Sequence, residues 1–526
     1  MTNRIPMVRV AVLNWNGLAF TPRCLEHLLA TNWPSDRLEV MVIDNASSDG
    51  SAEEVARRFP QVRVVQNGAN LGFVGLNTAF VDLDGIDYVA LVNNDAFVEP
   101  GWLAPLVATL EADPQLGAAS ARMIFAPRFH ELVIESPTFR PPGDARSLGV
   151  QIRGLAVRSE SVFGRAQFIA GCFGEEPRPG GTFRWTSERA VIRVPVPADR
   201  TGAQFGFVDV ELQAESDKLV ILRCGAYRVR ALVGPEPKIV RVPYWGEPFD
   251  VIQNAGSVLI DDGFGADRGF LAIDEGQYDK PCDLFNWCGG AVLLRRQFIE
   301  HAGPFDERFF LYYEDTDWSW RGQKFGWRYR YVPDSRVRHV HGGSGGEGSE
   351  VFHFHVERNR LLMLAKNAPA RMAAEQVARF VTATASYALR DVLLPLLRGR
   401  RPPLRYVRIR ARAFSSFLRL APAMLRERRG IRQRQVVPDE VLASRWISRK
   451  AWSAHERRIV ETAGHYREVT FPPMPPFHPL PVDGNGASRV GGGSAAPAPI
   501  VADLQDGGAA GAAAAQATGT GEGHAI

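Results

Sequence analysis

Acidic and aromatic residues are interleaved in one segment of this 526-residue chain. Within Phe309–Trp318, the acids Glu314, Asp315 and Asp317 stand among five aromatic side chains. A solvated run of charge would not normally have such apolar neighbours. Apolar surroundings raise the pKa of a carboxyl group, and a raised pKa suits a general base. The segment therefore favours a catalytic carboxylate over a solvated charged face.

Two further acids come directly after apolar runs of strand type. Asp44 follows Leu38–Ile43, and Asp95 follows Tyr88–Val92 after two asparagines. A carboxylate at a strand end can accept hydrogen bonds from a nucleobase N–H or a ribose hydroxyl. One or two carboxylates also suffice to hold Mg²⁺ or Mn²⁺ on phosphates. Taken alone, the turn after Asp44 favours a helix cap, and Asp95 fits a cap for a helix that starts near Pro100.

Histidines occur in two H-x-H patterns, His339 with His341 and His353 with His355. On a strand, this spacing turns both rings to the same side. A neutral imidazole could complete a metal shell begun by Asp95. On spacing alone, a structural role is favoured for both pairs.

Several function classes are disfavoured by missing patterns. No G-x-G-x-x-G follows the first apolar run and no G-x-x-x-x-G-K-[ST] occurs, which disfavours dinucleotide oxidoreductases and P-loop NTPases. No G-x-S-x-G elbow marks a serine hydrolase. The five cysteines are scattered without a C-x-x-C, so neither a disulfide framework nor a zinc knuckle is expected. A net charge of +4 does not by itself imply a nucleic-acid partner.

The elements that position these residues follow from periodicity. In the first ~125 residues, strand and helix patterns alternate, which predicts a parallel sheet with helices on both faces. Ligands of such sheets bind beyond the carboxyl ends of the strands, where Asp44 and Asp95 lie. From about residue 145 to 250, short β-type runs are separated by Gly and Pro, which indicates an all-β sandwich. The α/β character resumes near Ala255.

The C-terminal part is helical and basic. Residues 371–460 contain 21 Lys and Arg against 6 Asp and Glu. A nucleic-acid site is disfavoured because Arg398–Arg412 holds only one aromatic residue, Tyr406. A solvated helical face stays open. Peripheral docking on anionic lipid is favoured, with Val407–Leu425 as an interfacial amphipathic helix.

No segment predicts a clear membrane-spanning helix, because the best candidate, Phe380–Leu397, contains Arg390 and Asp391. The first residues lack the pattern of a signal peptide, so we expect a cytoplasmic protein, with peripheral contact at the inner face of the plasma membrane.

Taken together, the motifs resemble inverting family 2 glycosyltransferases of the GT-A fold, and bacterial rhamnosyltransferase-like members in particular. The resemblance covers about 1–127 and 254–368. It rests on the following segments: Asn14-Trp15-Asn16-Gly17, Val42–Ser51, Asn70-Leu71-Gly72-Phe73 with Asn77, Asn93-Asn94-Asp95, Cys288-Gly289-Gly290, Gly303-Pro304-Phe305-Asp306-Glu307, Glu314-Asp315-Thr316-Asp317 with Arg321, and His339 with Ser344.

The resemblance implies an α/β fold: a Rossmann-like GT-A domain, an inserted all-β sandwich and a C-terminal helical extension. The expected domains are 1–127 (nucleotide-binding half), 128–253 (β insert), 254–368 (acceptor and catalytic half), 369–475 (basic helical extension) and 476–526 (disordered Gly/Ala/Pro-rich tail).

The resemblance also implies roles for single residues. Asp315 would be the catalytic base, and Asp95 with His339 would bind Mg²⁺ or Mn²⁺. The family's D-x-D motif lacks its first acid here, because Asn93 stands in that position. The implied donor-binding residues are Asn16, Asp44, Asn45, Asn70, Gly72, Asn77, Asn94, Asp95 and Arg358. The implied acceptor-binding residues are Gly289, Gly290, Glu314 and Trp318.

The expected activity is transfer of a sugar, with rhamnose as the first candidate and galactofuranose or another hexose as alternatives. The donor would be a nucleotide-sugar and the acceptor a glycan or a polyprenyl-linked sugar, in surface or cell-wall polysaccharide synthesis. A degenerate transferase that acts as a glycan-binding scaffold is the alternative from another class. In the insert, Trp185, Tyr227, Tyr244 and Trp245 could stack on sugars, although a packing role is favoured. A nucleotidyltransferase is disfavoured, because Asn14-Trp15-Asn16-Gly17 lacks a Gly-rich basic loop.

Overall fold

A computed structural model describes residues 4–197, 204–340, 349–399 and 401–462. The chain forms two compact units, Met1–Ala126 with Asp250–His455, and Pro127–Phe249 with Glu456–Ile526. The first unit is therefore interrupted by the second. The tail predicted for 476–526 lies outside the described residues, as do His341 and Ser344.

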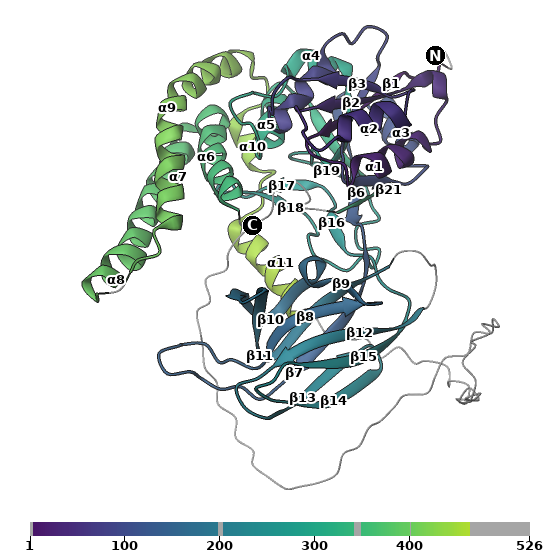
Figure 1. The fold of residues 1–526 in the computed structure, drawn as a ribbon. Coiled ribbons are helices and arrows are strands. Elements are labelled where there is room, and N and C mark those ends of the chain that lie inside the picture. The colour runs from purple at the N-terminus through teal and green to yellow at the C-terminus, as the bar shows by residue number, and fades with distance from the viewer. Residues whose placement is uncertain (1–3, 198–203, 341–348, 400, 463–526) are drawn as a thin grey trace, which may run out of the picture. The chain divides into compact units, whose positions relative to one another are not determined.

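The first unit is built on a mixed sheet in the order β19-β21-β6-β20-β4-β1-β2-β3 (Figure 1). Its parallel part joins β1 to β2 and β4, and β2 to β3. The strand β20 runs antiparallel between β4 and β6, and β21 runs parallel to β6. The strands are β1 (Val8–Asn14), β2 (Leu38–Asp44), β3 (Arg63–Gln66), β4 (Tyr88–Asn93), β5 (Ala96–Val98), β6 (Leu116–Phe125), β16 (Ile252–Asn254), β19 (Cys282–Leu284), β20 (Ala291–Arg295) and β21 (Arg328–His339), with the hairpin β17 (Ser257–Leu259) and β18 (Gly265–Asp267) beside them.

Both faces of this sheet are buried, as its apolar strands predict. Along β1, Val8, Val10 and Val12 face one core, and Ala11 faces the other. The first core is covered by α1 (Thr21–Leu29), α2 (Ser51–Arg58) and α3 (Leu103–Ala112). The second is covered by η2 (Phe73–Phe80), α4 (Arg296–Ala302) and α5 (Glu314–Lys324). This arrangement confirms the predicted GT-A-like α/β fold.

The second unit is an antiparallel sheet in the order β14-β13-β7-β11-β8-β12-β15, with one apolar core. Its long strand β11 (Gly181–Val196) pairs with β8 near its start and with β7 along its second half, as corner strands of sandwiches do. The other strands are β7 (Arg128–Glu135), β8 (Gln151–Val157), β9 (Glu160–Ser161), β10 (Gln167–Arg178), β12 (Gln204–Gln213), β13 (Lys218–Cys224), β14 (Tyr227–Val233) and β15 (Lys238–Gly246). The predicted all-β insert is thus confirmed.

Of the four aromatic residues considered for sugar stacking, Tyr227 and Tyr244 are buried inside the second unit. Tyr244 packs in the apolar core and against His130, with ring centroids 4.6 Å apart. Trp185 is half-buried and lies edge-on to Phe139. The two tyrosines therefore fill the insert, which is the packing role that the sequence favoured.

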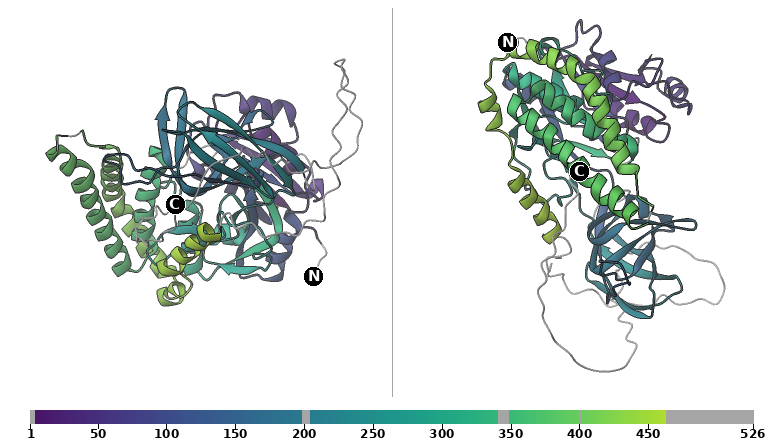
Figure 2. Two further views of the ribbon diagram at one scale, coloured as in Figure 1. Left: turned by 90° about the horizontal axis from the view of Figure 1, so that it is seen from below. Right: turned by 90° about the vertical axis from the view of Figure 1, so that its left-hand side faces the viewer.

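Helices complete the first unit. The helices α6 (Glu350–Asn367), α7 (Ala370–Tyr387) and α9 (Arg405–Arg434) pack on one another side by side (Figure 2). The shorter elements are η1 (Ser35–Arg37), η3 (Phe163–Arg165) in the insert, η4 (Ala388–Leu393), α8 (Leu394–Leu397), α10 (Asp439–Ala443) and α11 (Arg449–Thr462). The apolar side of α9, with Phe417 and Met424, is buried against α6 and α7. The protein itself thus covers Phe417 and Met424, whereas Leu418 and Leu425 of the predicted interfacial segment Val407–Leu425 are exposed, and membrane contact of this segment stays a prediction.

One helix of the described chain, Ala370–Leu397, is long and apolar enough to cross a membrane by length and composition. Its most apolar 18-residue window has a mean hydropathy of 1.2, and 6% of that window is buried. This helix contains the best candidate from the sequence, Phe380–Leu397, and it passes Arg390 and Asp391 as the π-helical segment η4 between α7 and α8.

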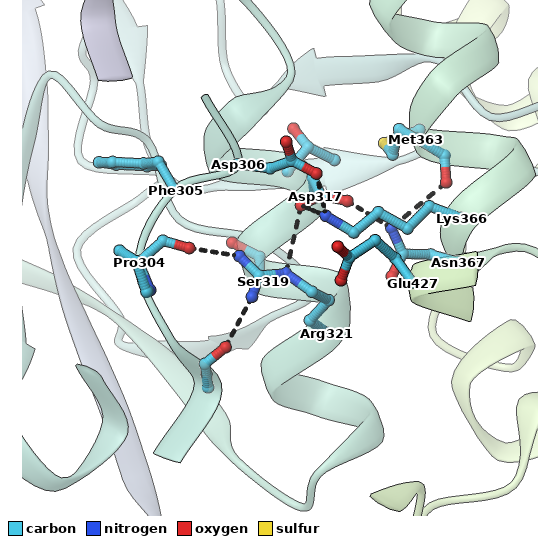
Figure 3. Close-up of polar contacts among 12 residues, drawn as sticks. Pro304, Phe305, Asp306, Asp317, Ser319, Arg321, Met363, Lys366, Asn367 and Glu427 are labelled. Carbon is cyan, nitrogen blue, oxygen red and sulfur yellow. Dashed lines mark hydrogen bonds and ion pairs between the residues drawn. The ribbon is translucent and has the colours of Figure 1, made fainter. Parts of the chain in front are cut away.

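A buried ionic cluster joins α5 to α6 (Figure 3). The Nζ atom of Lys366 donates to Asp306 Oδ2 at 2.7 Å and to Asp317 Oδ2 at 2.9 Å. Asp317 is fully buried and also accepts hydrogen bonds from Arg321 and Asn367. Burial by itself raises the pKa of Asp306, but the hydrogen bonds of Arg308 and the charge of Lys366 hold that pKa well below its ordinary value.

We predict that Lys366→Met destabilises the first unit by about 3–5 kcal/mol, because it leaves two buried carboxylates short of one cation. The exposed pair Arg371–Glu375 supplies the control, and Arg371→Met should leave the stability nearly unchanged. Urea unfolding followed by tryptophan fluorescence measures both, since nine of the eleven tryptophans lie in the first unit. Equal effects of the two substitutions would contradict the role of the cluster.

Candidate active site

Polar residues gather where the parallel strands end. Asn14, at the end of β1, pairs in register with Asp44 at the end of β2, and Asn93 ends β4 on the other side of β1. These carboxyl ends lie at one edge of the sheet, which is where open α/β sheets bind ligands. The edge therefore brings together the residues that the sequence singled out after Leu38–Ile43 and Tyr88–Val92.

Asp44 is buried and fully engaged in hydrogen bonds. Its Oδ1 accepts from Asn14 Nδ2 at 2.7 Å and from Ser47 Oγ at 2.6 Å, and its Oδ2 accepts from Ser47 N at 3.0 Å. The helix α2 begins at Ser51 after Gly50 and has no side-chain cap. Asp44 therefore orders the turn over the strand ends rather than capping the helix. Asn16 closes the other side of this turn, since its Oδ1 accepts from Ser48 N at 2.8 Å.

Asn45, Asn70 and Gly72 form a second group at this edge. Asn45 Nδ2 donates to Gly72 O at 2.9 Å, and Gly72 N donates to Asn70 Oδ1 at 2.9 Å. Gly72 has a φ of 68°, and a Cβ there would lie 2.2 Å from Phe310 O. Only glycine fits this position, so the 70–73 turn can lie directly against the segment that precedes the acidic motif.

Asn77 is committed to the backbone. Its Nδ2 donates to Phe305 O at 3.0 Å and its Oδ1 accepts from Phe305 N at 2.9 Å. Both ends of the amide are thus used to hold the 303–306 loop. The predicted contact of Asn77 with a donor is corrected to a structural role.

Asp95 and His339 meet just beyond the carboxyl end of β4. Asp95 Oδ1 lies 2.9 Å from His339 Nε2, and both side chains are buried. Asn93 Nδ2 lies 3.2 Å from the same ring nitrogen, and Gln253 Oε1 lies 2.7 Å from His339 Nδ1. The pairing of β5 and β21, which places Ala96 opposite His339, brings these distant residues together. Asn94 turns away and donates to Thr21 Oγ1 at 3.1 Å.

The fit of a divalent cation can be judged from these donors. A carboxylate oxygen and an imidazole nitrogen at one point are a partial set, and Mg²⁺ commonly takes few protein ligands when phosphates supply the rest. The second ring nitrogen of His339 is held by Gln253, as outer partners of metal-bound histidines usually are. Among the described residues, no three His, Cys, Asp or Glu side chains group as a metal site. The residues therefore fit a cation that shares its shell with a bound diphosphate.

Asp315 lies at the start of α5. Its Oδ2 accepts from Gly289 N at 3.2 Å, and its Oδ1 accepts from Thr316 N at 2.6 Å and Thr316 Oγ1 at 3.2 Å. Burial raises the pKa of Asp315 to about 6; the hydrogen bonds oppose this shift and the charge of Asp267 adds to it. Burial, helped by the charge of Asp315, raises the pKa of Glu314 well above its ordinary value. Burial thus favours the neutral form of Glu314.

The chain before Asp315 is strained. Phe310, Tyr312 and Tyr313 all have φ values of 66° to 68°, which non-glycine residues rarely adopt. Asn359 Nδ2 donates to the carbonyl oxygens of residues 309, 311 and 312 at 2.7 to 2.8 Å. Such strain persists only where neighbours hold it, and here it sets the start of α5.

Arg358 serves the same loop. Its Nη2 donates to Arg308 O at 3.0 Å and to Phe309 O at 2.8 Å, and its Nε donates to Asn359 Oδ1 at 2.8 Å. Burial, with the charge of Arg419, lowers the pKa of Arg358 to about 10. The predicted diphosphate contact of Arg358 is therefore corrected to support of the strained loop.

The predicted acceptor contact of Trp318 is also corrected. It is fully buried and stacks on Phe298 with ring centroids 5.3 Å apart. It also lies edge-on to Phe305, with ring centroids 4.6 Å apart. A side chain in this position packs α5 on the sheet and cannot meet an acceptor.

Gly289 and Gly290 connect the two ends of the site. Gly289 N donates to Asp315, and Gly290 O accepts from Asn93 N at 3.0 Å. A Cβ on Gly289 would lie 2.7 Å from the Phe73 ring. The segment Gly289-Gly290 thus connects Asp315 with Asn93, which contacts His339.

Sequence reasoning missed three residues that follow the insert. Gln253 holds His339, and Asn254 Nδ2 donates to Asp267 Oδ1 at 2.5 Å. Asp267 acts electrostatically on Asp315. These residues match no motif, and only their position directly after the insert could have drawn attention to them.

Comparisons with known proteins agree with this geometry. Residues 10–159 match the family model "Glycosyl transferase family 2". Residues 10–159 thus form a glycosyltransferase family 2 domain. The match extends beyond Ala126, where the first compact unit is interrupted.

Relatives of this glycosyltransferase are distant. An uncharacterized glycosyltransferase of Haemophilus influenzae is 26% identical over 117 residues, which cover 22% of this chain and 35% of that protein. The N-acetylglucosaminyl-diphospho-decaprenol L-rhamnosyltransferase of Mycobacterium tuberculosis is 23% identical over 358 residues, or 66% of this chain and 79% of that protein. Among solved structures, GalNAc-T7 with UDP, GalNAc and Mn²⁺ is 13% identical, with a TM-score of 0.38 over 69% of this chain and 48% of that one.

The raised pKa of Asp315 predicts a pH dependence. A base acts only when deprotonated, so kcat should rise about tenfold per pH unit below pH 6 and level off above it. Thr316→Val removes a hydrogen bond that lowers this pKa and should move the inflection upward. Thr109→Val, which removes a hydroxyl on α3, should leave it unchanged. A rate that is flat from pH 5 to 8 would contradict the assignment of Asp315.

Proposed function

We propose that this glycosyltransferase moves a sugar from a nucleotide-sugar donor to an acceptor hydroxyl in one displacement that inverts the anomeric carbon. The observation that carries the proposal is the contact path from Asp95 and His339 through Asn93, Gly290 and Gly289 to Asp315. It joins a site suited to a diphosphate to a carboxylate suited to deprotonating a hydroxyl.

The donor end is assigned as follows. The turns around Asp44 and Asn16, and around Asn45 and Asn70, line the strand ends and would receive the nucleoside. Asp95 and His339 would hold Mg²⁺ or Mn²⁺. Such an ion, when bound, supplies Lewis-acid stabilisation of the nucleoside diphosphate as a leaving group.

At the other end, Asp315 would accept the proton of the acceptor hydroxyl. With a pKa of about 6, it is roughly 90% ionised at pH 7 and still basic enough to take a proton as the new bond forms. Burial favours the neutral form of Glu314, which would lessen the negative charge next to the attacking oxygen. Gly289 N and Thr316 fix the carboxylate, so less orientation is lost when the substrates meet.

The choice of sugar and acceptor draws on similarity. The name of the mycobacterial relative, a rhamnosyltransferase acting on a decaprenol-linked sugar, supports rhamnose and a polyprenyl-linked acceptor of surface or cell-wall polysaccharide. Galactofuranose or another hexose stays open as the donor sugar. A lipid-linked acceptor would lie in a membrane, and the helical extension would bind the surface of that membrane.

The assignment of the base is tested by Asp315→Asn. We expect loss of transfer by at least 10³-fold, because no other described carboxylate contacts both Gly289 and Thr316, while the affinity for the donor changes by no more than a few-fold. Product formation from a radiolabelled donor and calorimetric donor binding measure the two quantities. Turnover near that of the wild type would remove Asp315 as the base.

The metal end is tested by thermal shift with nucleoside diphosphates and sugar nucleotides, with and without Mn²⁺ or Mg²⁺. Binding at 100 times Kd adds about 2.7 kcal/mol of stability. Asp95→Ala should abolish the metal-dependent part of the shift, whereas Asp36→Ala, at an exposed position, should not. If the folded protein responds to no nucleotide but binds glycans, the alternative of a glycan-binding scaffold holds instead.

A further inference from the structure

The hairpin formed by α7 and α9 ends in an apolar tip. Leucines at 389, 393, 394, 396 and 397 are all exposed, and Leu397 is 74% exposed. The tip projects beyond the end of α6 (Figure 1). Monomeric proteins rarely expose so many neighbouring leucines without a partner.

The hairpin below the tip is held firmly by its own contacts. Arg410 on α9 donates to Thr384 Oγ1 at 2.9 Å and to Phe380 O at 3.2 Å. Phe380 is buried and stacks on Phe414 with ring centroids 5.7 Å apart. Burial thus stops near Thr384, and the last turns of the helix extend from a rigid base.

Arginines surround the tip. Arg390, Arg398, Arg401 and Arg405 are exposed; Arg390 pairs with Asp391, and Arg405 pairs with Glu350. Leucines with a collar of arginines fit the boundary between acyl chains and anionic headgroups, where the guanidinium groups meet phosphates. The span from Leu389 to Leu397 rises about 12 Å, close to the depth of interfacial insertion.

We propose that the tip formed by residues 389–397 inserts into the surface of an anionic bilayer and that the arginine collar binds lipid phosphates. A second copy of the chain fits less well, because two such tips would bring arginines of like charge together. Spanning is also disfavoured, since Phe380 and Gln376 on the same helix are buried against the protein. The inference extends the partner part of the proposed function, but lipid binding does not need the transfer reaction.

Vesicle flotation of the full-length protein tests the proposal. Vesicles of phosphatidylcholine with phosphatidylglycerol are compared with vesicles of phosphatidylcholine alone, in the absence of donor. The wild type should float with the anionic vesicles, and Leu393→Glu/Leu397→Glu should reduce the bound fraction at least tenfold. Arg398→Gln/Arg401→Gln should reduce binding to the anionic vesicles and weaken its dependence on salt.

Matched controls separate the tip from other exposed leucines. Leu418 and Leu425 on α9 are 54% and 51% exposed, and Leu418→Glu/Leu425→Glu should stay within twofold of the wild type. Nucleotide-induced thermal shifts of each variant confirm folding and keep a failure of lipid binding distinct from a failure of sugar transfer.

Three outcomes would overturn the proposal. The first is a wild type that does not float with anionic vesicles, and the second is a tip variant that floats as the wild type does. The third is an α9 control that loses binding as strongly as the tip variant. A wild-type dimer that the tip substitutions dissociate, without vesicle binding, would assign the tip to a second copy.

Discussion

The position of α5 depends on a buried ammonium group. Lys366 on α6 bridges Asp317, one turn beyond the start of α5, and Asp306, in the loop that Asn77 holds from the opposite side. Charges buried this deeply tolerate little displacement, because each loses its partner as soon as it moves. The start of α5, which carries Asp315, is thereby held in place. The strained loop before it adds a second constraint, since Asn359, on the same helix as Lys366, donates to the carbonyl oxygens of residues 309, 311 and 312. Thus α6 holds the start of α5 through two separate sets of contacts.

The two pKa shifts at the start of α5 follow from this rigidity. A flexible turn would let water reach Glu314 and Asp315 and return both carboxyl groups toward their ordinary values. Because the turn is held, burial keeps the pKa of Glu314 well above its ordinary value and the pKa of Asp315 at about 6. The raised pKa values of these two adjacent acids are therefore a property of the packing around them.

Much of this could be predicted from the sequence, and the limits have physical causes. Asp315, Asp95 and Asp44 were found because strand ends and apolar surroundings leave a local signature. The roles of Asn77, Arg358 and Trp318 were assigned wrongly, because position within a motif does not reveal whether a polar or aromatic side chain points to the ligand or to the backbone. The apolar side of Val407–Leu425 was likewise visible as a pattern, but the pattern could not say whether lipid or α6 covers it. Helix contacts between distant segments decide such questions, and no local pattern contains them.

Residues that follow the insert contact the candidate site. The first unit resumes at Asp250, and within five residues the chain reaches both ends of the site: Gln253 contacts His339, and Asn254 contacts Asp267, whose charge acts on Asp315. Strand β16 pairs with β6, the last strand before the insert, so the two points where the chain leaves and re-enters the first unit are hydrogen-bonded neighbours. An insertion at this place could be accommodated without moving the sheet, yet its exit strand supplies side chains to both ends of the site. The region after the insert is thus linked to both ends of the candidate site.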